Sequence, residues 1–123
     1  MMSTDTIHSM STRRYNLTDV INEQSYLQVP RWLKEKKGIS PDLKYLYVLM
    51  YDLQKVSLKN GWSDELGQVY IYMSIETIME EMECARQKAI RLKKELMKLG
   101  LIDDIQMGCN KPNRIYVKKP WEY

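Results

Sequence analysis

Basic and amide side chains recur along one stretch of the sequence at the spacing of a helix. Between Ala85 and Gly100, a projection at about 100° per residue places four side chains on one side, namely Gln87, Arg91, Lys94 and Lys98. Arginine can direct two donors onto guanine and glutamine can pair with adenine, whereas lysine is a point charge suited to phosphate. No acidic residue lies on this stripe. The pattern favours contact with DNA over the alternative, a lysine-rich helix with a merely solvated outer face.

The opposite side of the same stretch is apolar and is expected to face a core. It consists of Ala85, Ala89, Leu92, Leu96 and Leu99. Arg86 and Lys88 flank the cationic stripe at its N-terminal end, the part of a recognition helix that usually contacts base edges. Ile90 and Met97 project sideways, and residues in such places are more often peripheral core than DNA contacts.

Two kinds of DNA contact are therefore predicted. Base contacts are expected from Arg86, Gln87, Lys88 and Arg91. Phosphate contacts are expected from Ser74, Lys94, Lys98, Lys111 and Arg114. Lys111 and Arg114 belong to a hairpin that either follows the DNA backbone or is an ordinary turn. Asp103 and Asp104 at the start of that hairpin are unfavourable next to phosphate.

The segments before the stripe predict two helices and a strand. Ser40, Pro41 and Asp42 supply an N-cap, a proline at the first helical position and an acid in the first turn of a helix that runs to about Ser57. Residues 68–73 are β-branched and aromatic and predict a strand. Ser74 then caps a second helix, which carries Glu76 in its first turn.

The segments after the stripe predict a β-hairpin. Gly100 ends the helix, residues 101–105 and 114–118 have strand composition, and residues 107–113 are rich in turn formers. Two helices joined by a short turn and followed by a hairpin form a winged helix-turn-helix. We therefore predict an α+β fold with a three-helix core and a small antiparallel β-wing.

The N-terminal part of the chain offers a possible dimer surface. We expect residues 1–24 to be a flexible arm, residues 25–119 the DNA-binding domain, and residues 120–123 the start of a linker to an absent C-terminal domain. An apolar segment at the start of the domain is a predicted homodimer interface formed by Tyr26, Leu27, Val29 and Trp32. Packing of the same side chains on their own core is the equal alternative.

Composition limits the class of protein. A length of 123 residues suits one domain, and two cysteines without a nearby histidine indicate neither a disulfide framework nor a metal site. Residues 84–120 hold ten basic and three acidic residues, whereas the remainder holds nine basic and thirteen acidic ones. This segregation creates a local positive field that attracts polyanions. With no apolar run near the ~20 residues of a membrane span, we expect a soluble cytoplasmic protein.

Several stretches resemble the N-terminal domain of RepA-type replication initiators from plasmids of Gram-positive bacteria. The resemblance is carried by Tyr26-Leu-Gln-Val-Pro30, Ser57-Leu-Lys-Asn-Gly-Trp62, Gly67-Gln-Val-Tyr-Ile71, Lys94-Glu-Leu96, Leu99-Gly-Leu-Ile102 and Asn110-Lys-Pro-Asn-Arg-Ile-Tyr-Val117. It implies a domain that binds repeated sites in a plasmid origin, usually as a dimer, and that works with host replication proteins through a further C-terminal domain. The chain departs from the family pattern at Ala85 and Lys88, where serine or threonine is common, and at Asp103 and Asp104, where the wing is commonly more basic.

Other functions are weighed against this one. An enzyme is not expected, because the single histidine, His8, lies in the arm and no phosphate-binding loop, nucleophile elbow or metal-ligand motif occurs. No cofactor or metal is expected either. A winged-helix transcriptional repressor and a purely protein-binding winged helix are the two rivals, because a fold does not fix a function.

Overall fold

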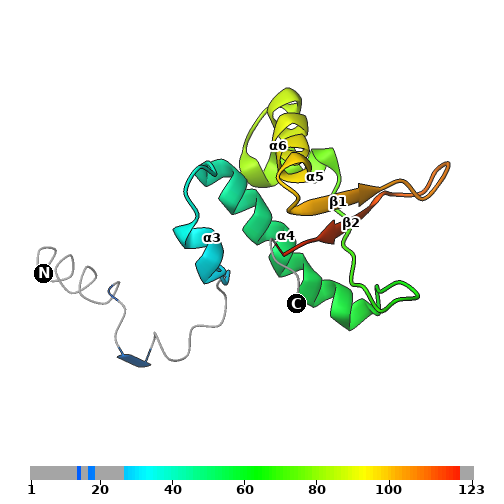
Figure 1. The fold of residues 1–123 in the computed structure, drawn as a ribbon, viewed down its shortest axis with the longest axis horizontal. Coiled ribbons are helices and arrows are strands. Elements are labelled where there is room, and N and C mark those ends of the chain that lie inside the picture. Colours follow the sequence, from blue (N-terminus) through cyan, green and yellow to red (C-terminus); the bar gives the residue numbers. More distant parts are fainter. Residues whose placement is uncertain (1–13, 15–16, 19–26, 120–123) are drawn as a thin grey trace, which may run out of the picture.

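The chain folds as a winged helix. The computed structural model describes Arg14, residues 17–18 and residues 27–119, so most of the predicted arm and residues 120–123 lie outside the described residues. Within residues 27–119 the elements are α3 (Arg31–Glu35), α4 (Pro41–Asn60), α5 (Ile75–Met82), α6 (Arg86–Lys98), β1 (Ile102–Ile105) and β2 (Arg114–Val117) (Figure 1). The helix-turn-helix of α5 and α6, followed by the β1–β2 wing, confirms the predicted fold class.

Helix α4 is the longest element and begins as its sequence predicts. The Ser40 hydroxyl accepts a hydrogen bond from the Leu43 amide at 3.3 Å, and Pro41 occupies the first turn. The helix continues past its predicted end and stops at Gly61, whose φ of 70° suits glycine. Ser57, at the predicted end, is still helical, and its buried hydroxyl donates to the Tyr70 carbonyl oxygen at 2.7 Å, so a polar side chain is satisfied in the core.

The helix-turn-helix has a capped start at α5 and a sharp turn between α5 and α6. Ser74 caps α5 by accepting from the Thr77 amide at 3.1 Å, and Glu83 ends α5 in the left-handed region at φ 49°. Ala85 and Leu99 were expected in the core, and that expectation is wrong: both are exposed, at the N-cap and C-cap of α6. The helical projection fails at Ala85 because its backbone is extended, at φ −74° and ψ 163°, whereas Leu99 keeps right-handed helical dihedrals and is nevertheless exposed at the end of the helix. Between them, the interior side chains Ala89, Leu92 and Leu96 are buried as predicted.

The wing is a two-stranded antiparallel hairpin that extends away from the helices (Figure 1). Ile102 pairs with Val117 and Ile105 with Arg114. The strand predicted at residues 68–73 does not form: Val69 bridges back to Ser63, and only Ile71 bridges to the wing, at Ile115. Because neighbouring residues pair with different segments, no continuous ladder develops.

One core lies between the three main helices and the wing. Its buried members include Leu33, Leu43, Leu46, Tyr47, Met50, Ile71, Ile78, Ala89, Leu92, Leu96, Ile102 and Ile115. Tyr47 is also tied to the end of the wing, since its hydroxyl donates to the Lys118 carbonyl oxygen at 2.8 Å. Burial raises the pKa of Tyr47 to about 12, so the phenol remains a donor at neutral pH. The core therefore fixes α6 and the wing on one rigid body.

Candidate nucleic-acid interface

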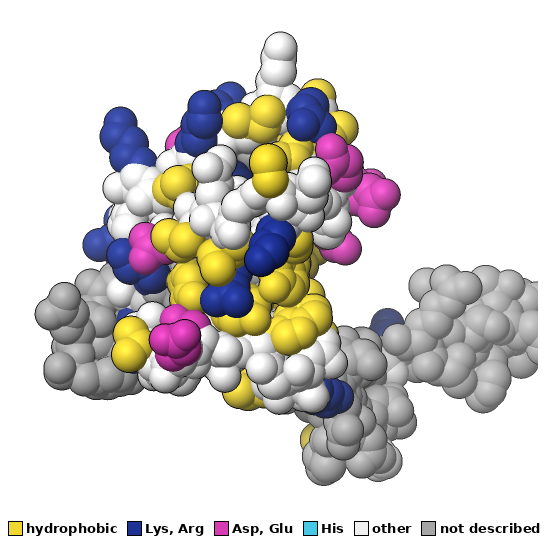
Figure 2. All heavy atoms as spheres, turned by 90° about the vertical axis from the view of Figure 1, so that its right-hand side faces the viewer, with side chains coloured by type: hydrophobic (Ala, Val, Ile, Leu, Met, Phe, Trp, Pro, Cys, Tyr) yellow, Lys and Arg dark blue, Asp and Glu magenta, His cyan; other side chains and the backbone are white. Residues whose placement is uncertain are grey.

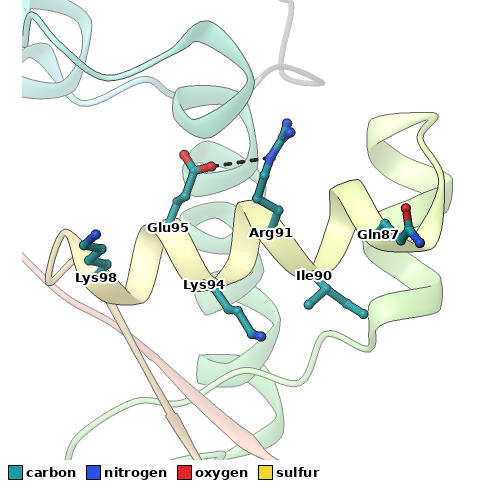
Figure 3. Close-up of a pocket in the computed structure, with 6 residues that line it drawn as sticks. All are labelled: Gln87, Ile90, Arg91, Lys94, Glu95 and Lys98. Atoms are coloured by element: carbon teal, nitrogen blue, oxygen red, sulfur yellow. Dashed lines mark ion pairs between the residues drawn. The ribbon is translucent and has the colours of Figure 1, made fainter.

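The outer face of α6 is an exposed ridge. Its four projected side chains, Gln87, Arg91, Lys94 and Lys98, are all exposed, and with Ile90 and Glu95 they line a shallow open hollow (Figure 3). Leu92 and Leu96 on the opposite side are buried in the core. The helix therefore presents cations and an amide outward while leucines anchor it from behind.

Arg91 is partly engaged by an acid on its own helix. Its Nε lies 3.4 Å from Oε1 of Glu95, one turn further along, and the Arg91 side chain is 63% exposed. Figure 3 shows the end of the guanidinium pointing away from α6, beyond this contact. Glu95 lies just beside the stripe on which no acid was expected, so the ridge is less purely cationic than the projection indicated. The two terminal nitrogens of Arg91 still form a free fork.

The two cations at the start of α6 are held by acids from other helices. Nη1 of Arg86 lies 2.8 Å from Oε1 of Glu76 in α5, and Nζ of Lys88 lies 2.8 Å from Oδ2 of Asp42 in α4. The hydrogen bond from Arg86 lowers the pKa of Glu76. The sequence identified both acids only as first-turn residues and missed their contacts with α6, because residues ten or more positions apart give no local signal of contact.

The wing places its two predicted phosphate ligands differently. Lys111 is exposed in the loop between β1 and β2, whereas Arg114 is half-buried with its guanidinium carbon 4.2 Å from the centre of the Tyr70 ring. Hydrogen bonding with Tyr116 raises the pKa of Arg114, which therefore keeps its charge. Ser74 uses its hydroxyl to cap α5. Contact of all three side chains with phosphate stays a prediction.

The acids that weigh against a DNA-binding wing each form an ion pair with a lysine of the same chain, Asp104 nearly buried and Asp103 at the surface. Oδ2 of Asp104 lies 3.0 Å from Nζ of Lys93, with both side chains only 13–14% exposed, and Oδ1 of Asp103 lies 3.4 Å from Nζ of Lys118. These pairs offset the two carboxylates locally. The Lys93–Asp104 pair also connects α6 directly to β1.

An aromatic cluster lies between the wing and the loop after α4, and sequence reasoning did not single it out. Trp62, Tyr72, Tyr70 and Tyr116 are joined by edge-to-face contacts with centroid distances of 5.0–6.0 Å. On the side of the molecule drawn in Figure 2, hydrophobic side chains gather around Lys and Arg side chains in the middle of the face. The edge-to-face packing of the rings holds the loop against the wing.

The residues of the predicted dimer interface differ in their exposure. Leu27 and Val29 are exposed, while Trp32 packs edge-to-face on the Tyr47 ring at 5.3 Å, which is the alternative arrangement for that residue. Tyr26 lies outside the described residues. The homodimer stays a prediction, now resting on the exposed pair.

The described residues contain neither a metal-binding cluster nor a membrane-spanning helix. No group of three or more metal-ligating side chains comes together in this part of the chain. No helix among the same residues is long and apolar enough to cross a membrane.

Comparison with known proteins gives a consistent family. The family model for the N-terminus of replication initiator protein A (RepA) matches residues 25–121. A 41 kDa protein of Lactobacillus helveticus is 32% identical over 117 residues, covering 88% of this chain, which spans 33% of that relative's length. A solved structure described as the N-terminal domain of a DNA-binding protein superposes with a TM-score of 0.71 at 30% identity, covering 90% of this chain and 86% of the other.

A second solved structure, described as a Rep–DNA complex, superposes with a TM-score of 0.70 at 31% identity and covers 90% of this chain and 87% of the other. The family model and the two solved structures each match most of the chain, including the helix-turn-helix and the wing. The chain belongs to the family of replication initiator protein A N-termini.

Proposed function

We propose that this domain binds repeated sites in the double-stranded DNA of a plasmid origin and thereby initiates replication. The observation that carries the proposal is the ridge of Gln87, Arg91, Lys94 and Lys98, exposed on a helix whose other side is locked in the core. A rigid helix with this surface has the shape and chemistry to enter a major groove. The domain acts by binding and not by catalysis.

The roles follow from position along α6. Arg91 directs its free fork to a guanine edge, and Gln87 pairs with an adenine one turn closer to the helix start. Lys94 and Lys98, further along, contact phosphates. Arg86 and Lys88 reach base edges only after they leave their acid partners, Glu76 and Asp42.

The wing adds contacts to the DNA backbone. Lys111 is exposed in its loop and is free to approach phosphate, while the half-buried Arg114 supports the base of the wing and adds positive potential. Ser74 lies at the start of α5, where backbone amides and the positive end of the helix dipole favour a phosphate.

Family membership supports this function, as does the solved structure described as a Rep–DNA complex. We further propose that the protein acts in the cytoplasm as a homodimer and contacts host replication proteins through a C-terminal domain. The relative from Lactobacillus helveticus, three times as long as the matched segment, is consistent with additional domains.

A footprint of the purified domain on its own plasmid tests the proposal. Protection of tandem copies in the origin is the expected result. Protection at a promoter alone would instead indicate a transcriptional repressor. A domain that acts through protein contacts alone would leave every duplex unprotected and would have no salt-sensitive affinity for DNA.

A further inference from the structure

One apolar side chain lies among the polar side chains of the α6 ridge. The shallow hollow on the outer face of α6 is lined by Gln87, Ile90, Arg91, Lys94, Glu95 and Lys98 (Figure 3). Ile90 is the only apolar residue of this set, and it is half-buried. It lies three residues after Gln87 and directly before Arg91, so it belongs to the half of α6 that is proposed to read bases.

The core does not account for an apolar residue at this position. Leu92 and Leu96, on the inner side of α6, are buried in the core cluster, and the partly buried Met79 of α5 packs against that cluster. Within residues 27–119, Ile90 is neither a member of the cluster nor one of the side chains packed against it. Peripheral core, the more usual role beside a polar stripe, therefore does not explain Ile90.

The major groove offers an apolar side chain one distinctive partner. The base edges there present hydrogen-bond donors and acceptors, and the 5-methyl group of thymine is the apolar group among them. Isoleucine suits this contact because its branched Cβ restricts χ1, so little rotamer freedom is lost when the side chain meets the groove. On the same face, Gln87 and Arg91 suit the donors and acceptors of base edges, whereas Ile90 suits the methyl group.

We propose that Ile90 is a specificity-determining residue that contacts the 5-methyl group of one thymine when α6 enters the major groove. The inference rests on the proposed function of α6 and adds to it the chemical group that one position of the DNA site must present. Burial of the methyl group against Ile90 removes apolar surface from water, which favours thymine over cytosine and uracil at that position.

Uracil in place of thymine tests the contact without any change to the protein. Each thymine of the origin duplex that the footprint protects is replaced in turn by uracil, which removes one methyl group and keeps base pairing. Fluorescence anisotropy gives the affinities. Uracil at the contacted position should weaken binding about three- to fivefold, as expected for a methyl group that loses its apolar contact. Equal affinity for the parent duplex and every uracil-containing duplex would overturn the proposal.

Two variants assign the effect to Ile90. Ile90→Ala shortens a half-buried side chain and introduces a strong helix former, so α6 should remain folded. Met97→Ala is the matched control, because Met97 is an exposed apolar residue two turns further along the same side of α6 and does not line the hollow. Ile90→Ala should bind the thymine and uracil duplexes with equal affinity, whereas Met97→Ala should retain the full difference. Retention of the uracil effect in Ile90→Ala would overturn the proposal, because another side chain would then contact the methyl group.

A random duplex of equal length separates a base contact from a general effect on the domain. Ile90 carries no charge, so Ile90→Ala should change neither the affinity for this duplex nor its salt slope. An equal loss on the origin and random duplexes would mean that Ile90 supports α6 and does not read a base, which overturns the proposal. Salt-independent binding of the unmodified domain, or equal affinity for the two duplexes, would contradict the proposed function itself, and the inference would fall with it.

Discussion

We predict that sequence reading by α6 depends chiefly on Arg91. Because its terminal nitrogens are free while Nε contacts Glu95, the side chain is partly oriented before DNA arrives. Arg91→Ala should weaken the free energy of binding to the origin duplex by about 1–3 kcal/mol and relax specificity at one base pair. Anisotropy on duplexes altered at each position in turn measures this. An equal loss on origin and random duplexes would exclude a base-reading role.

Lys94, one turn along the same ridge, should behave differently. Because we propose that Lys94 contacts phosphate as a point charge, Lys94→Ala should weaken DNA binding evenly across sequences. It should also reduce the salt slope by about 0.9. Lys59→Ala is the control, since Lys59 is exposed in the last turn of α4, away from α6. Sequence-dependent losses for Lys94→Ala, or a salt slope equal to that of the control, would argue against the assignment.

Among the elements, α6 and the wing depend on one another through the Lys93–Asp104 pair. Both side chains are nearly buried, so Lys93→Ala leaves the Asp104 carboxylate without its cation and should destabilise the domain by about 3 kcal/mol. Urea unfolding measures the loss. A Lys93→Met, Asp104→Leu double variant should recover most of it, because two apolar side chains replace the pair. A single variant as stable as the parent would contradict this coupling.

The loop between α4 and residue 70 is held by one carboxylate. Oδ1 of Asp64 accepts from the amides of Gln68 at 2.8 Å and Leu66 at 2.9 Å, and Oδ2 accepts from the Tyr116 hydroxyl at 3.0 Å. The hydrogen bond from Gln68, followed by those from Tyr116 and Leu66, lowers the pKa of Asp64.

A lowered pKa in the folded state means that Asp64 stabilises the fold above its unfolded pKa of about 3.9. That contribution should disappear as pH falls through the lower folded value. Asp64→Asn should therefore be less stable than the parent at neutral pH, and the difference should shrink below about pH 4. Unfolding free energies of both proteins between pH 2.5 and 7, chosen to span the ~3.9 reference value, test this. A difference independent of pH would contradict the assignment.

The elements also show what the sequence can predict. Burial of Ala89, Leu92 and Leu96 follows from spacing within one helix, so a local pattern was sufficient. Residues 68–73 have strand composition, but tertiary pairing decided their conformation, and only Ile71 bridges to the wing. The acid partners of α6 come from other helices, so no spacing rule indicates them. The ridge itself was predictable, whereas its neutralised start was not.

At the scale of the whole molecule, the fold converts a segregated sequence into a directed surface. The basic segment of residues 84–120 forms both α6 and the wing. Its two hairpin acids, Asp104 and Asp103, form ion pairs with Lys93 and Lys118, respectively. Lys94, Lys98 and Lys111, which have no ion pair among the described residues, therefore leave unneutralised positive charge near the proposed DNA surface. This arrangement gives a chain with a net charge of only +3 a local positive field that can attract DNA.

Binding to repeated sites gives a dimer a clear advantage, because two linked domains bind neighbouring sites with a raised effective concentration. Val29, exposed at 53%, lies in the predicted interface. Leu66 is exposed at 82% in the loop after α4, so Leu66→Asp is the matched control for Val29→Asp. Val29→Asp should yield a monomer that binds a single site normally but loses the additional affinity for tandem sites. Analytical ultracentrifugation and anisotropy measure the two properties. Val29 is exposed, so its replacement should leave the core intact. An unchanged association state in Val29→Asp would therefore mean that the N-terminal segment does not form the dimer.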